Sequence, residues 1–146
     1  MNTLILKIIS VLWLIWGFVH VFAGVVTIAR RAPDSVAGVA DAVDPAEFIG
    51  SYHAATDALI NQHGFNLFWI GLVTMVCAVL VWRNKTMLFQ ALFTAALVGG
   101  LADVGYFIFM DIGGFVNFMP GTVMTIFSGT AILLSIWVWQ QTRSER

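Results

Sequence analysis

Charged side chains are scarce in this chain: Asp, Glu, Lys and Arg make up 10% of its 146 residues. Soluble domains carry about 25% charged and roughly 45–50% apolar residues, whereas apolar residues make up 60% here. A surface exposed to water cannot be built from so few charges, so we expect most of this surface to face lipid. The seven basic residues are balanced by eight acidic ones, and no basic patch for nucleic acid is present.

Signatures of common catalytic and metal centres are also missing. Cys77 is the only cysteine, so the chain has no internal disulfide and no cysteine cluster, and its apolar neighbours predict a packed thiol. No His-Glu-x-x-His zinc motif is present. The glycines at 113, 114 and 121 lack the spacing and the lysine of a phosphate-binding loop. The serines show no nucleophile elbow, which argues against acyl-transfer chemistry.

The chain has instead four long apolar runs, at residues 4–28, 65–82, 86–110 and 122–139. Crossing a hydrocarbon layer of about 30 Å takes about 20 helical residues, and the first run is too long for a signal peptide. Backbone polar groups in lipid must bond within their own segment, so each run is predicted to be a helix. The predicted fold is therefore all-α: a single transmembrane domain over residues 1–146, built as an integral membrane four-helix bundle.

The connection between the first two spans is the only long one. Residues 32–43 show no clear period. Asp44 then suits an N-cap and Pro45 the first position of a helix, apolar residues recur on one face, and Gly64 suits a helix stop. We therefore predict one extra amphipathic helix over about 45–63, lying in the membrane interface or over the bundle.

Basic residues favour a cytoplasmic location for both termini. With the N-terminus inside, five basic residues lie at the inner ends of the spans, and only Arg30 and Arg31 lie at the outer ends. The predicted location is the cell membrane (the inner membrane), with the lipid bilayer as the first partner. Small residues such as Gly17 and Gly24 on the first span and Ser128 on the fourth predict close helix packing. A homo-oligomer or a larger membrane complex stays an open alternative.

Ionisable side chains gather near the outer ends of the spans. His20 lies in the outer half of the first span, and Asp103 lies in the outer half of the third. A charged aspartate near the bilayer centre costs about 2.5–3.5 kcal/mol, so Asp103 is expected to face the bundle interior and to find a partner. Both residues lie on helix faces that carry small and aromatic side chains. We therefore predict a direct His20–Asp103 pair.

The candidate site is built around this pair. Asp103, His20 and Asp57 are the candidate catalytic residues, with carboxyl groups as acids and His20 as base or orienting partner. The candidate ligand-binding residues are Tyr106, Asn66, His63, Asp111, Asn117, Tyr52 and Trp16. His53 and His63 are candidate metal ligands, because His53 is four residues from Asp57 and such spacing presents two ligands on one helix face. These patterns leave the identity of any cofactor open.

Three classes of function follow from these patterns. In the first, the outer pocket binds a small lipophilic ligand or a metal without turnover. In the second, the protein is a membrane-embedded enzyme that isomerises or cyclises a hydrophobic substrate by carboxylate and imidazole acid–base chemistry. In the third, it is an accessory subunit with a structural polar cluster. A pocket lined by His20, Asp103 and Tyr106 would favour the first two classes, and a filled bundle would favour the third.

Overall fold

Four long helices form the bundle in the computed structural model, which describes residues 3–48, 50–83, 87–117 and 121–144. They are α1 (Thr3–Ala29), α3 (Ala54–Arg83), α4 (Leu88–Tyr106) and α5 (Gly121–Ser144). A π-helical turn, η2 (Phe107–Asp111), continues α4. With that turn included, all four are long and apolar enough to cross a membrane. Within the described ranges there is no strand, so the all-α prediction is confirmed.

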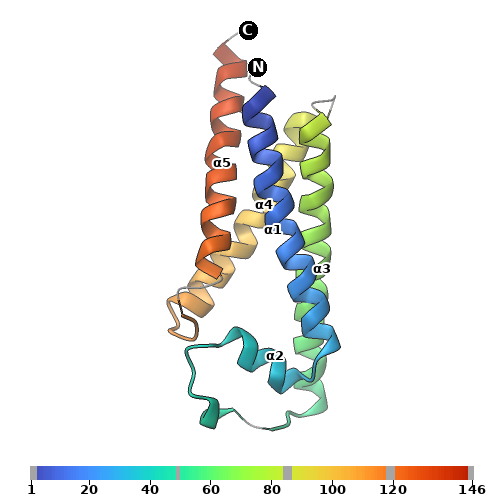
Figure 1. Cartoon of the computed structure of the whole chain (residues 1–146), viewed down its shortest axis with the longest axis vertical. Coiled ribbons are helices and arrows are strands. Elements are labelled where there is room, and N and C mark those ends of the chain that lie inside the picture. Colours follow the sequence, from blue (N-terminus) through green and yellow to red (C-terminus); the bar gives the residue numbers. More distant parts are fainter. Residues whose placement is uncertain (1–2, 49, 84–86, 118–120, 145–146) are drawn as a thin grey trace.

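The outer surface and the ends of the bundle fit a multi-pass membrane protein. Large apolar side chains point outward, and Phe93, Phe109 and Leu133 are 69%, 73% and 70% exposed. The two ends of the chain lie at the same end of the bundle (Figure 1). Four long helices that each run the length of the bundle return the chain to the end where it started, so both termini lie on the same side.

The predicted amphipathic helix over 45–63 is wrong in its bounds. Asp44 does act as a cap, because its Oδ1 accepts a hydrogen bond from the Ala46 amide at 2.9 Å. Only the 3₁₀ turn η1 (Pro45–Glu47) follows it, and the backbone is already extended at Phe48. The chain then enters a stretch that contains Gly50, a residue that disfavours helix. A cap and a proline were therefore enough for one turn but not for a helix.

Helix α3 starts later than predicted and continues without a break into the second span. His53 caps its start, since the His53 Nδ1 accepts a hydrogen bond from the Ala55 amide at 3.2 Å. Gly64 was expected to stop a helix and does not. A Cβ atom on Gly64 would lie 2.9 Å from the Cβ of Thr27, so this glycine allows α1 to approach closely. The second span is thus part of one 30-residue helix, Ala54–Arg83.

Helices α1 and α3 pack through two glycine pairs. Gly17 meets Gly71, and Gly24 meets Gly64, so glycines seven residues apart on one helix face glycines seven residues apart on the other. A Cβ on Gly71 would lie 2.6 Å from the Gly17 carbonyl oxygen, closer than real Cβ atoms come. Small residues have this use in lipid, where backbones gain from close contact. The packing role predicted for Gly17 and Gly24 is confirmed.

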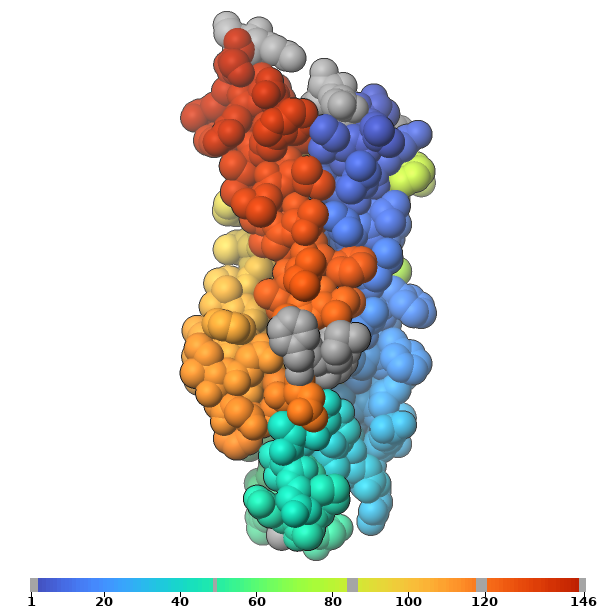
Figure 2. Space-filling model, turned by 60° about the vertical axis from the view of Figure 1, so that its left-hand side comes forward, coloured from blue at the N-terminus to red at the C-terminus, as the bar shows by residue number. Residues whose placement is uncertain are grey.

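A short helix that the sequence did not reveal, α2 (Ala32–Val39), follows α1. The turn after α2 is fastened to the loop after η2: the Asn117 amide donates to Asp41 Oδ1 at 2.6 Å, and the Ala42 amide donates to the Phe115 carbonyl oxygen at 3.2 Å. Figure 2 shows the teal segment after α2 lying against the orange segment at the end of α4 and η2. Together they cover the end of the bundle that is far from the termini.

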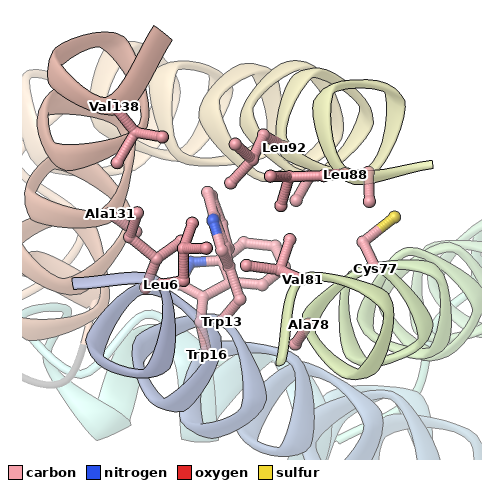
Figure 3. Packing of buried hydrophobic residues seen from close by; sticks show 13 residues of the cluster. Leu6, Trp13, Trp16, Cys77, Ala78, Val81, Leu88, Leu92, Ala131 and Val138 are labelled. Atoms are coloured by element: carbon pink, nitrogen blue, oxygen red, sulfur yellow. The ribbon is translucent and has the colours of Figure 1, made fainter. Parts of the chain in front are cut away.

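The apolar core fills the half of the bundle next to the termini. Trp13 and Trp16 of α1 point between the other helices (Figure 3) and are fully buried. The other buried members of this core are Leu6, Ile9, Cys77, Ala78, Val81, Leu88, Ala91, Leu92, Ala95, Ala131 and Val138. Gly99 of α4 makes room for the indole ring of Trp13, because a Cβ on Gly99 would lie 2.7 Å from Trp13 Cη2. The packed thiol predicted for Cys77 is confirmed.

Candidate functional site

A cavity of ≈ 700 Å³ lies in the other half of the bundle, toward α2. Residues from all four long helices, from α2 and from η2 line it. Most of the lining is apolar and includes Val19, Phe22, Leu67, Ile70, Leu101 and Met124. The polar and charged lining residues are His20, Thr27, Arg30, Ser35, His63, Asn66, Asp103 and Tyr106. The cavity is therefore a largely apolar space into which a few polar groups converge.

Trp16 lies between the two residues that were expected to pair. Its indole Nε1 donates to Asp103 Oδ2 at 2.9 Å, and its ring stacks on the His20 imidazole with centroids 3.5 Å apart. Among the side chains that the structure describes, no hydrogen bond or ion pair joins His20 to Asp103. The predicted direct pair is wrong. Trp16 is four residues before His20, so the two rings lie on one face of α1, and the longer indole reaches the carboxylate first.

Asp103 receives two hydrogen bonds on one of its oxygens. The Ser128 hydroxyl of α5 donates to the same Oδ2 that accepts from Trp16. Side chains of α1, α4 and α5 thus meet at a single carboxylate oxygen, and Asp103 is only 5% exposed. Oδ1 has no hydrogen-bond partner in the described part of the chain, and Asp103 lines the cavity. Oδ1 is therefore free to bond with an occupant of the cavity.

His20 lines the same space and has one ring nitrogen without a partner among the described residues. Its Nδ1 lies 2.8 Å from the Trp16 carbonyl oxygen. A carbonyl oxygen only accepts hydrogen bonds, so Nδ1 must carry the proton in this contact. In the neutral imidazole, Nε2 then has a lone pair and no proton. Over residues 3–48, 50–83, 87–117 and 121–144 no group bonds to Nε2, and His20 lines the cavity.

A second set of polar side chains lines the cavity closer to α2. The Nη1 of Arg30 lies 3.9 Å from where a Cβ on Gly38 would be, so the guanidinium group lies close to the C-terminal part of α2. His63 and Asn66 of α3 line the same space, and Asn66 Oδ1 accepts a hydrogen bond from Trp69 Nε1 at 3.1 Å. This part of the wall holds a cation and neutral polar groups, while the far part holds Asp103.

The predicted site residues divide into two groups. Five of them line the cavity: His20, Asp103, Tyr106, Asn66 and His63. Trp16 does not line it but contacts His20 and Asp103 from the core side. The remaining candidates lie outside the lining: Asp57, Asp111, Asn117, Tyr52 and His53. The functional roles assigned to both groups stay predictions.

The residues outside the lining have contacts of their own. The Asn117 side-chain amide donates to the Asp41 carbonyl oxygen at 3.0 Å, and His53 caps α3. Asp57 and Asp111 each have one buried carboxylate oxygen with no hydrogen-bond partner among the described residues. In that part of the chain no group of three or more His, Cys, Asp or Glu side chains is placed to hold a metal ion. The metal hypothesis for His53 and His63 therefore rests on the sequence alone.

Four polar residues at the cavity were missed by the sequence analysis: Thr27, Arg30 and Ser35, which line it, and Ser128, which bonds to Asp103. Ser128 was assigned to helix packing, and the structure adds its bond to Asp103. Arg30 was counted only as a marker of orientation. Its position ten residues after His20, close to three helical turns along α1, was the available signal that both could line one elongated space.

Comparisons with known proteins assign no function to this chain. No protein family, no curated protein and no solved structure matches it.

Proposed function

We propose that this chain is a membrane protein that binds a small lipophilic molecule in its cavity, with the polar group of that molecule held by His20 and Asp103. The observation that carries the proposal is the cavity of ≈ 700 Å³, apolar over most of its wall, with polar groups at defined places. Small-molecule sites in proteins have about 300–1,000 Å³ and this kind of lining.

The hydrogen-bonding capacity left over in the cavity supports binding over a purely structural role. A structural polar cluster would satisfy its own groups, because buried polar atoms without partners cost free energy. Asp103 Oδ2 is doubly satisfied, whereas Asp103 Oδ1 and His20 Nε2 have no partner in the described structure. A filled bundle was the expectation for an accessory subunit, and the cavity counts against that alternative.

The proposal includes the cell membrane as location, with both termini in the cytoplasm. Lys7 and Arg143 are near the end of the bundle that carries the termini, and each lies over an indole ring: Lys7 Nζ is 5.4 Å from the Trp82 ring centroid and the Arg143 guanidinium carbon is 4.3 Å from that of Trp139. Basic and aromatic residues together are typical of a membrane interface, and basic residues favour the cytoplasmic side.

Native mass spectrometry of the protein taken from membranes into lipid nanodiscs tests the binding proposal. We expect the wild-type chain to retain a molecule that is not a bulk lipid. Gly105 lines the cavity, and a Cβ on it would meet no atom within 4 Å, so the side chain of Gly105→Leu begins in open space at the cavity wall. The variant should lose about tenfold in occupancy, which corresponds to ~1.4 kcal/mol.

Gly129→Leu is the matched control for this experiment. Gly129 also has no atom within 4 Å of its Cβ position, but it does not line the cavity. We expect Gly129→Leu to retain the molecule as the wild type does. Equal occupancy in both leucine variants, or no bound molecule in the wild type, would overturn the proposed function.

A further inference from the structure

We propose that the cavity selects lipophilic molecules whose deeply placed polar group donates a hydrogen bond, an alcohol in the simplest case, over isosteric molecules that can only accept one. This inference rests on the proposed function and adds the chemical class of the ligand. It follows from two side-chain atoms of cavity-lining residues, His20 Nε2 and Asp103 Oδ1, which have no hydrogen-bond partner among the described residues.

His20 sets the requirement for a donor. The Trp16 carbonyl oxygen holds the ring proton on Nδ1 at 2.8 Å, so Nε2 of the neutral ring offers a lone pair to the cavity. The stacked indole of Trp16, 3.5 Å away between centroids and inclined by 18°, restrains the ring from turning over. A ligand that only accepts hydrogen bonds leaves this nitrogen without a partner.

Asp103 fits an alcohol in either of its protonation states. The ionised carboxylate is a second acceptor beside His20 Nε2, so the single O–H of an alcohol donates a hydrogen bond to one of the two; on Asp103 it is Oδ1 that accepts, because Oδ2 is occupied by Trp16 and Ser128. The neutral acid can carry its proton on Oδ1 and donate it to the ligand oxygen, while that oxygen donates to His20. A hydroxyl group both donates and accepts. A fluoride or an ether oxygen can only accept, so it fits poorly in both cases.

The length of the cavity indicates a single-chain molecule. His20 of α1 and Arg30, which directly follows the last residue of α1, both line it; ten residues span ~15 Å along a helix. The wall between them includes Phe22, Ala23 and Val26 of α1. An alkyl chain that lies along this wall keeps its polar end at His20. Dodecanol and dodecyl fluoride have nearly the same length and shape, and the fluoride lacks the O–H donor.

The test uses competition for a photoactivatable probe in nanodiscs. The probe is a long-chain alkanol with a diazirine on its chain, and the competitors are dodecanol and dodecyl fluoride at matched mole fractions in the lipid. We expect cross-links on cavity-lining residues, and we expect dodecanol to displace the probe at about tenfold lower mole fraction, the ratio for one hydrogen bond of ~1.4 kcal/mol. Equal potency, or a more potent fluoride, would overturn the inference.

A substitution of His20 tests whether this residue is the source of the preference for alcohols. His20→Phe keeps an aromatic ring against Trp16 but removes the lone pair, so the advantage of the alcohol over the fluoride should fall well below tenfold, and what remains is the contribution of Asp103 Oδ1. Leu133→Phe, which adds a phenyl ring at an exposed position outside the cavity lining, should keep the tenfold ratio. A ratio that persists in His20→Phe contradicts the assignment. The wild-type comparison decides the inference by itself if the His20 variant does not fold.

The outcomes separate this inference from the proposed function. If neither competitor displaces the probe, and the cross-links fall only on lipid-facing residues, the cavity is not a binding site and both proposals fail. If the two competitors displace it equally from cavity-lining residues, the binding site stands and the preference for a donor fails.

Discussion

Replacing Gly71 by alanine adds one methyl group at the closest contact between α1 and α3. The new Cβ would lie 2.6 Å from the Gly17 carbonyl oxygen and 2.7 Å from the Val21 amide nitrogen. Both atoms belong to the backbone of α1, so no side chain can turn aside. The shortfall is 0.8 Å, from 2.6 Å to the 3.4 Å at which ordinary contact begins. The two helices must separate by that order of distance, which also loosens the neighbouring pair of Gly24 and Gly64.

Two opposing effects set the magnitude. Overpacking a well-packed contact costs about 1–3 kcal/mol, and alanine gains up to ~1 kcal/mol over glycine in helix propensity. The contact here is with backbone, so we take the upper part of the first range and expect a net loss of about 1–2 kcal/mol. For a chain of this length that corresponds to a fall in Tm of about 5 °C, at roughly 3–4 °C per kcal/mol.

Thermal unfolding in nanodiscs, followed by tryptophan fluorescence, measures this loss. Gly129→Ala is the control, because a Cβ at Gly129 meets nothing within 4 Å and the same gain in helix propensity applies. We expect the Tm of Gly129→Ala to equal or exceed that of the wild type. If Gly71→Ala is as stable as Gly129→Ala, α1 and α3 are not in backbone contact at this site, and the account of the glycine pairs is wrong.

Two further predictions concern the carboxylate network and the orientation. Trp16→Phe and Ser128→Ala should destabilise the protein non-additively, because Trp16 and Ser128 both donate to Asp103 Oδ2. In a double-mutant cycle we expect a coupling free energy of about 0.5–3 kcal/mol. Additive losses of stability would contradict the shared acceptor. In a chain whose native cysteine is replaced by alanine, a thiol at position 50 (Gly50→Cys) should react with an impermeant maleimide added to intact cells. A thiol at position 144 (Ser144→Cys) should react only after lysis, and the reverse pattern would refute cytoplasmic termini.

The four spans could be predicted because lipid imposes strong constraints on sequence. Apolar runs of sufficient length with few charges have few alternatives, and the structure places α1, α3, α4 with η2, and α5 over them. The short segments were harder. Gly64 was interpreted by the rule for helix ends in water, whereas in this bundle it serves contact between helices. The eight residues of α2 are too few for periodicity to be read from them.

The cavity was predicted better than its contacts. Depth along the spans brought His20, Asp103, Tyr106, Asn66 and His63 to one region, and all five line one cavity. The prediction that His20 is the partner of Asp103 was wrong, because the spacing of residues along a helix does not show how far each side chain extends. Trp16 is one turn from His20, and its indole has both the length and the N–H to bond across to α4. An imidazole at position 20 bonds to its own helix instead.

The two halves of the bundle differ in how tightly they are packed. Around Trp13, packing is tight enough that Gly99 has no room for even a methyl group, and this half anchors all four long helices. The opposite half contains open space and positions such as Gly105 where a side chain meets nothing. Sequence changes there alter the size and polarity of the chamber while the anchored half keeps its structure. Under the proposed function, substitutions in the open half would change which molecule fits, while the packed half keeps the helices in place.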